Sequence, residues 1–156
     1  KKNFNKIVFI NGEKKYPASG IDEMIKLLNK NSLVYGSRFL NKVSVKKNMP
    51  TIKYFANPFL TKIINFLSNQ NYSEYFSGFR GYKVEDLKKI KYHKLSNSWI
   101  FEQQMMFEII KKKMNIGEFM IPTVYGDQVS LVPPIRYCIT LAISVFYYFI
   151  FKRFSN

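Results

Sequence analysis

Four short runs, separated by polar segments, lie at 7–10, 33–35, 78–83 and 116–121. Three of them are mainly apolar, whereas 78–83 combines Phe and Tyr with Gly, Arg and Lys. Their length is typical of buried strands, and the second run ends at a glycine and the fourth at a proline, both of which favour turns. The pattern therefore predicts four strands.

Between these runs, apolar residues recur at helical spacing. Ser19 is a candidate N-cap for a first helix, whose inner face would hold Ile21, Met24, Ile25 and Leu28. Asn57 and Pro58 form a cap and first-turn pair. They predict a second helix with the following side chains turned inward: Phe59, Ile63, Phe66 and Leu67.

Three more helices are expected towards the C-terminus. A short one is predicted at 84–90, and a longer one capped by Ser98 runs to residue 113. An apolar helix follows at 137–151. Strands that alternate with helices are typical of an α/β layered domain, which is the fold class that we expect.

The amino-acid composition excludes several kinds of catalytic and metal site. The chain has 156 residues and is 47% hydrophobic, which excludes a disordered protein. A single Cys and a single His exclude a disulfide framework, a cysteine-cluster zinc site and a histidine triad. Any reaction must therefore rest on carboxylates, arginines, hydroxyls and backbone groups.

The formal net charge of +15 favours a polyanionic partner, such as a phosphate ester or an anionic membrane. Lysines outnumber arginines by 21 to 4, and Asn, Ile, Phe and Tyr are also abundant. Translation of A/T-rich DNA explains that bias equally well. The basic residues form no long run or stripe, so nucleic acid is not an expected partner.

Three loops carry candidate chemistry, and we expect them beyond the C-terminal ends of strands, where ligands bind in open α/β sheets. Residues 11–13 offer the oxygens of Asn11 and Glu13 to a divalent cation. Arg38 has a planar guanidinium that can bind phosphate oxygens in a bidentate manner. The third loop places an acid, a hydroxyl, a glycine and an arginine within seven residues: Glu74, Ser77, Gly78 and Arg80.

Taken in order, these loops resemble the family 2 glycosyltransferases, in particular the branch that loads sugars onto polyprenyl or dolichyl phosphate. Residues 10–17 (INGEKKYP) are similar to that family's strand, Asp-x-Asp and Pro. Residues 34–39 (VYGSRF) are similar to its Gly-Ser-Arg-Phe, and residues 74–80 (EYFSGFR) to its Asp-x-x-Ser-Gly-Phe-Arg. The pair at 101–102 (FE) and the segment 117–127 (GEFMIPTVYGD) match its Phe-Glu and its Glu-x-x-Ile-Pro-Thr-x-Tyr-Gly-Asp.

The resemblance implies a fold and a reaction. Residues 1–134 would be the second half of a GT-A domain, whose first, nucleotide-binding half is not in this sequence, and residues 135–156 a juxtamembrane or interfacial helix. The implied reaction is an inverting transfer of a sugar from a nucleotide-sugar donor to a polyprenyl-phosphate-type lipid, for cell-envelope polysaccharide or glycoprotein synthesis.

The resemblance also implies roles for residues. Mg²⁺ or Mn²⁺ would bind at Glu13 and Asn11 and neutralise the leaving diphosphate, more weakly than at two carboxylates. Arg38 and Arg80 would position the acceptor phosphate, and Glu74 would be the base or would orient the acceptor. The implied substrate-binding residues are Ser37, Arg38, Ser77, Gly78 and Tyr125. Two structural alternatives stay open, namely an ion pair between Arg80 and Glu74 and a place for Tyr125 in the core.

Residues 137–151 carry no charge. As a helix they reach only about 22 Å, short of the roughly 30 Å hydrocarbon core of a bilayer. A helix in the membrane interface, or one leg of a longer membrane segment, therefore fits better than a lone span. Lys152 and Arg153 would hold it against anionic lipids at the cytoplasmic face of a membrane. A core helix on the sheet is the alternative.

Two other functions stay open at this stage. The chain can be a catalytically degenerate or truncated relative, as Asn11 in place of an acid suggests. It can also be a non-enzymatic basic module that binds an anionic membrane or, with less support, nucleic acid. Dependence of binding on salt, without preference for a sugar nucleotide, would identify the second class.

Overall fold

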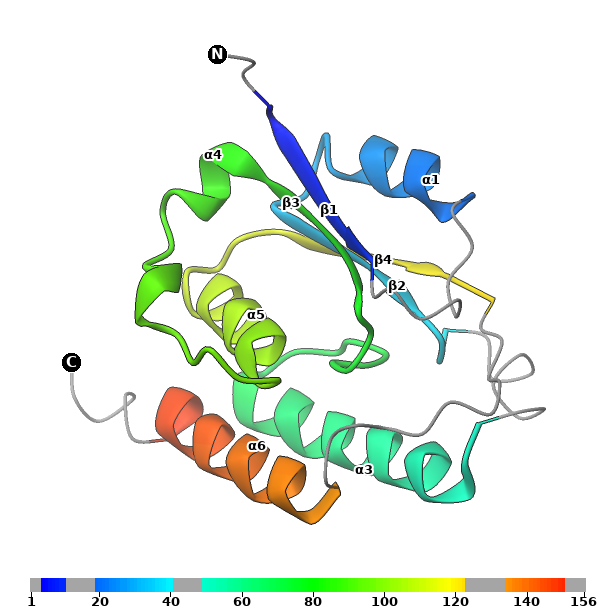
Figure 1. Cartoon of the computed structure of the whole chain (residues 1–156), viewed down its shortest axis with the longest axis vertical. Coiled ribbons are helices and arrows are strands. Elements are labelled where there is room, and N and C mark those ends of the chain that lie inside the picture. The colour runs from blue at the N-terminus through cyan, green and yellow to red at the C-terminus, as the bar shows by residue number, and fades with distance from the viewer. Residues whose placement is uncertain (1–3, 11–18, 41–48, 123–133, 151–156) are drawn as a thin grey trace.

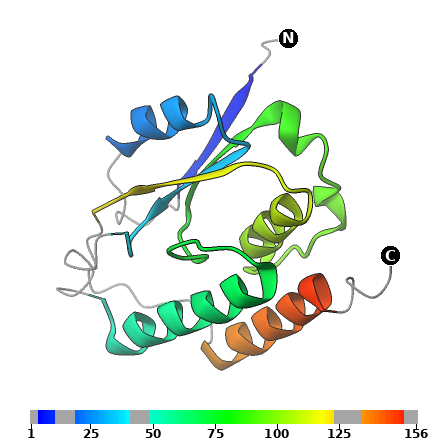
Figure 2. The same ribbon diagram turned by 180° about the vertical axis from the view of Figure 1, so that it is seen from behind.

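The fold is a mixed α/β arrangement with one central sheet (Figure 1). The structure, a computed structural model, describes residues 4–10, 19–40, 49–122 and 134–150. Within them, helix α1 covers one face of the sheet, and α3, α5 and α6 lie on the other side (Figures 1 and 2). The predicted α/β class is confirmed at this level.

The sheet has four strands in the order β1-β3-β2-β4. Their bounds are Lys6–Ile10 for β1, Leu33–Ser37 for β2, Phe79–Lys83 for β3 and Ile116–Met120 for β4. β3 runs antiparallel to both β1 and β2, whereas β2 and β4 are parallel. The start of β3 and the ends of the other three strands therefore lie at the same edge, which we call the site edge.

Helix α1 (Gly20–Leu27) packs on one face of the sheet. Met24 and Leu28 are fully buried there against Val34 and Phe79. Gly81 in β3 makes this close packing possible, because a Cβ at this position would lie 2.6 Å from the Met24 sulfur. Ser19 is the N-cap residue as predicted, although its side chain makes no capping hydrogen bond.

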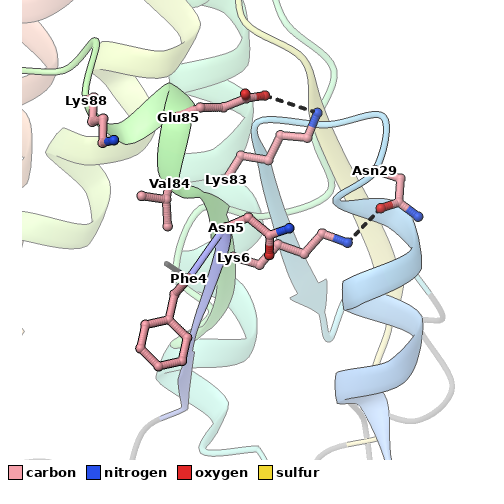
Figure 3. A pocket seen from close by; sticks show the side chains of 8 residues that line it. All are labelled: Phe4, Asn5, Lys6, Asn29, Lys83, Val84, Glu85 and Lys88. Carbon is pink, nitrogen blue, oxygen red and sulfur yellow. Dashed lines mark hydrogen bonds and ion pairs between the residues drawn. The ribbon is translucent and has the colours of Figure 1, made fainter. Parts of the chain in front are cut away.

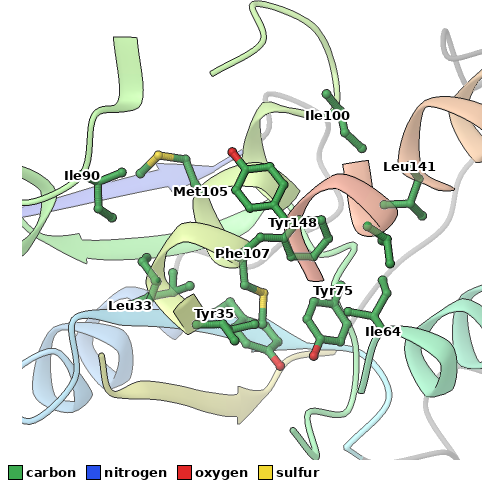
Figure 4. Packing of buried hydrophobic residues seen from close by; sticks show 14 of the residues in the cluster. Leu33, Tyr35, Ile64, Tyr75, Ile90, Ile100, Met105, Phe107, Leu141 and Tyr148 are labelled. Atoms are coloured by element: carbon green, nitrogen blue, oxygen red, sulfur yellow. The ribbon is translucent and has the colours of Figure 1, made fainter. Parts of the chain in front are cut away.

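The larger core lies on the opposite face (Figure 4). Helix α5 (Phe101–Lys111) brings Met106 and Phe107 against the sheet, where Leu33 and Tyr35 of β2 meet them. Side chains from α3 and α6 complete this core. The predicted cap of α5 is wrong, because Ile100 and not Ser98 is its N-cap residue. The Ser98 backbone carbonyl still accepts the Phe101 N–H.

Asp86 anchors the short helix α4 (Val84–Leu87) that follows β3. Burial acts to raise the pKa of its carboxyl, but hydrogen bonds from Lys89 and Ser32 outweigh burial and hold the pKa below its ordinary value. The Lys89 Nζ lies 2.5 Å from an Asp86 oxygen. A one-turn 3-10 helix, η1 (Tyr92–Lys94), leads on to α5.

For helix α3, both the predicted first residue and the predicted buried face are wrong. The helix is Thr51–Ser68, so Pro58 lies inside it rather than in its first turn. Phe59, Ile63 and Phe66 are exposed, and Thr61 and Ile64 are buried instead. Of the four side chains predicted to point inward, only Leu67 packs against the core. The helix is apolar on nearly every side, so its periodicity does not identify the buried face.

Helix α6 (Pro134–Phe149) divides its apolar residues between core and solvent. Leu141, Val145 and Tyr148 are buried, with the Tyr148 ring 5.7 Å from that of Phe107. Ile139 and Ile143 are exposed. Among the described residues, no helix has both the length and the apolar character that a membrane span requires.

Candidate functional site

The second and third candidate loops meet at the site edge. Ser37 ends β2 and Arg38 follows it, whereas Glu74 and Ser77 lie in the loop that leads into β3. We expected the third loop to follow a strand, but it precedes one. The antiparallel direction of β3 brings it to the same edge, and all four side chains are buried there.

Arg38 and Glu74 form a buried ion pair. The Arg38 Nη2 lies 2.5 Å from Glu74 Oε2, and its Nε donates to both carboxylate oxygens at 3.1 and 3.2 Å. The Arg38 backbone N–H also donates to Glu74 Oε1, at 2.5 Å. Because Arg38 is 7% exposed and Glu74 is fully buried, this carboxylate fixes both the main chain and the guanidinium of Arg38.

A second network of hydrogen bonds holds Ser73, the residue before Glu74, in place. The Ser73 hydroxyl donates to Glu118 Oε2, and the Ser73 N–H lies 3.1 Å from the same oxygen. Tyr35 donates its hydroxyl to Glu118 at 2.9 Å, and the Ser37 and Ser73 hydroxyls are 2.5 Å apart. Burial, together with the Glu118 charge, raises the pKa of Tyr35, so its hydroxyl stays protonated and remains a donor.

Sequence reasoning missed the roles of Ser73 and Glu118. In the sequence, nothing distinguishes Ser73 from other serines in loops. Glu118 was considered only as part of the motif at 117–127. A signal was present, since Glu118 is a charged residue in the middle of a strand. Its partner depends on register, because β2 and β4 pair Tyr35 with Glu118.

Arg80 is buried beneath the loop and holds its backbone. Its Nε donates to the Ser77 carbonyl, its Nη2 to the Tyr75 carbonyl and its Nη1 to the Glu102 carbonyl, at 2.6–2.7 Å. The guanidinium of Arg80 is therefore engaged by the main chain, and its nearest carboxylate in an ion pair is Glu102 at 3.9 Å. The alternative pairing with Glu74 is not formed, since Arg38 takes that position.

Of the other predicted substrate-binding residues, some lie at the site edge and one lies outside the described residues. Ser77 and Gly78 are buried at the turn into β3, and the Ser77 hydroxyl accepts the Phe79 N–H at 3.3 Å. Tyr125 lies outside the described residues, as do the proposed metal ligands Asn11 and Glu13.

The part of the chain that the structure describes contains no cluster of side chains typical of a divalent-cation site. No group of three or more His, Cys, Asp or Glu residues is found among those residues. The two carboxylates at the site edge are already occupied, Glu74 by Arg38 and Glu118 by Ser73 and Tyr35.

A polar pocket lies at the opposite edge of the sheet (Figure 3). Its walls come from the start of β1, the end of β3, helix α4 with the following Lys88, and Asn29. Lys6 in this pocket donates to Asn29 at 2.6 Å, and Lys83 pairs with Glu85 at 3.8 Å. Because the pocket lies at the far end of the strands from Arg38, it is separate from the candidate site.

Comparison with known proteins identifies no family for this chain. No protein-family model matches the chain, and a search of curated proteins finds no match either.

Proposed function

We propose that this chain is part of a family 2 glycosyltransferase that transfers a sugar from a nucleotide sugar to a polyprenyl-phosphate-type lipid. One observation carries the proposal. Segments that resemble separate motifs of that family, 34–39, 74–80 and 117–122, meet at one sheet edge. Arg38 joins the first to the second through Glu74, and Tyr35 joins the first to the third through Glu118.

In this proposal Arg38 is the phosphate-binding residue. Glu74 contacts its Nε and Nη2 and so fixes the orientation of the guanidinium, whose planar shape suits recognition of phosphate oxygens. A lipid phosphate is largely ionised near neutral pH and needs positioning more than deprotonation. Glu74 therefore acts mainly by orienting Arg38.

Arg80 and Glu118 are positioning residues in the same proposal. Arg80 holds the carbonyls of the loop before β3, and Glu118 holds Ser73. Together they fix the segment that carries Glu74. Ser37, Ser77 and Gly78 contribute to the shape of the turn, and Tyr125 stays a proposed substrate contact.

The proposal includes a divalent cation, Mg²⁺ or Mn²⁺, with Glu13 and Asn11 as its protein ligands. The cation would neutralise charge on the leaving diphosphate. We also propose that the protein works at the cytoplasmic face of a membrane, where a lipid acceptor and residues 135–156 would meet.

The test is a transfer assay on the complete gene product. A panel of radiolabelled nucleotide sugars is offered with a short-chain polyprenyl phosphate, with and without Mg²⁺ or Mn²⁺. Metal-dependent appearance of label in the lipid supports the proposal. Metal-dependent nucleotide-sugar binding without transfer would instead identify a degenerate relative, and absence of both would contradict the family assignment.

A further inference from the structure

Lysine side chains gather around two recesses at the edge of the sheet opposite the candidate site. The first recess is the pocket of Figure 3 and has a volume of about 510 Å³. The second, of about 500 Å³, lies beside Ser32 and the turn from α5 into β4, at 112–115. Six lysines line the two recesses, and we call this surface the basic edge: Lys6, Lys83, Lys88, Lys89, Lys112 and Lys113.

The two recesses are neighbours, because both border α4 and the residues that follow it. Glu85 and Lys88 line the first recess, whereas Asp86 and Lys89 line the second. The lysines of the basic edge come from three separate segments of the chain, at 6, 83–89 and 112–113. Folding therefore assembles this surface, which is why the basic residues form no stripe along the sequence.

The positive charge of the basic edge exceeds the negative charge of the acidic residues that line it. Two acidic residues of α4 lie there, and each is already paired with a lysine. Glu85 lies 3.8 Å from Lys83, and Asp86 lies 2.5 Å from Lys89. Six lysines against two acidic residues leave an excess of four positive charges. Charge of one sign gathered on one surface attracts a partner of the opposite sign.

We propose that the basic edge binds an acidic peptide segment of a partner protein. The two ion pairs of α4 show that lysines of this edge bind carboxylates. Lys88, Lys112 and Lys113 extend the same chemistry to solvent, because all three are exposed. Lysine ammonium groups are compact charges on flexible stems, so they can follow carboxylates at varied spacing along a peptide. Val84 and Met114 in the walls offer apolar contacts to the methylene groups of a glutamate.

An acidic peptide fits the basic edge better than a single-stranded nucleic acid does. Surfaces that bind single strands combine positive charge with aromatic side chains on which the bases stack. Among the described residues that line the second recess, none is aromatic. In the first recess Phe4 is the aromatic residue, and Figure 3 shows its ring pointing away from the ammonium groups of Lys6 and Lys83. The lysines therefore lack the stacking platform that a nucleic acid requires.

The inference is independent of the proposed function, because it requires neither sugar transfer nor a lipid acceptor. The experiment measures the fluorescence anisotropy of a labelled oligoglutamate peptide, and of a labelled single-stranded oligothymidylate of equal charge, with the complete gene product. The test variant is Lys88→Glu combined with Lys112→Glu. The control, Lys26→Glu combined with Lys62→Glu, changes the net charge equally at exposed lysines of α1 and α3. Circular dichroism checks that both variants are folded.

We expect oligoglutamate binding that weakens with salt, with a loss of affinity of about tenfold or more in the test variant and below about threefold in the control. The neutral pair, Lys88→Gln with Lys112→Gln, should show a smaller loss in the same direction. Three results would overturn the proposal. They are absence of oligoglutamate binding, equal losses in the test and control variants, and tighter binding of oligothymidylate than of oligoglutamate, which would assign the edge to nucleic acid.

Discussion

The pair formed by Arg38 and Glu74 predicts a large loss of stability when one partner is neutralised. The variant Glu74→Gln keeps nearly the same shape and can still accept the Arg38 backbone N–H. It removes the negative charge and replaces one of the two oxygens that the guanidinium contacts at 2.5–3.2 Å. Arg38 then stays 7% exposed without its counter-charge.

The expected cost follows from burial. Removal of one partner of a buried ion pair typically costs 3–5 kcal/mol, because it leaves an uncompensated charge away from water. We expect about 3 kcal/mol for Glu74→Gln, at the lower end of that range, since the amide preserves the backbone hydrogen bond. Arg38→Met should cost a similar amount, because it leaves the fully buried carboxylate unpaired.

The assay is urea unfolding followed by circular dichroism, completed as a double-mutant cycle. The double variant, Arg38→Met with Glu74→Gln, should lose about as much as the worse single variant, because both partners of one interaction are then gone. A cost below about 1 kcal/mol for Glu74→Gln, or simple additivity of the two costs, would refute the reasoning that this pair is buried and mutually dependent.

Three further predictions concern other parts of the molecule. Gly81→Ala should lower the free energy of unfolding by roughly 1–3 kcal/mol, measured in urea, because the new methyl group meets Met24. The pKa of Asp86 is lowered on folding, so its contribution is present above pH 3.8 and is lost as pH falls through the folded pKa. The stability difference between the unmodified chain and Asp86→Asn should therefore shrink under acid, and a constant difference would contradict this. In the complete gene product, Glu13→Ala should abolish metal-dependent transfer, whereas Asn11→Asp should tighten Mn²⁺ binding measured by calorimetry; full activity of Glu13→Ala would remove the metal assignment.

The strands were predictable because glycine, proline and polar loops punctuate short apolar runs. Each observed strand starts and ends within one or two residues of the predicted run. Helix α3 was not predictable to the same degree. Its apolar residues occupy both the buried and the exposed sides, and Pro58 resembles a first-turn residue although it lies inside the helix.

The candidate site was predictable in its members but not in their pairings. Arg38 and Glu74 were both singled out, and the structure brings them together. Which arginine meets Glu74 depends on the antiparallel direction of β3, which the sequence does not specify. The role of Glu118 was missed for the same reason, because its contact with Tyr35 depends on the register of β2 and β4.

The most direct measurement of the central claim compares sugar transfer by two charge-conserving variants of the complete gene product. Arg38→Lys keeps the charge but loses the planar guanidinium, whereas Lys26→Arg makes the reverse exchange at an exposed residue of helix α1. With the folded fraction of each variant measured, the account predicts that kcat/KM for transfer to polyprenyl phosphate falls about tenfold or more for Arg38→Lys and stays unchanged for Lys26→Arg. Equal transfer by both variants, or no transfer by the unmodified protein, would contradict it.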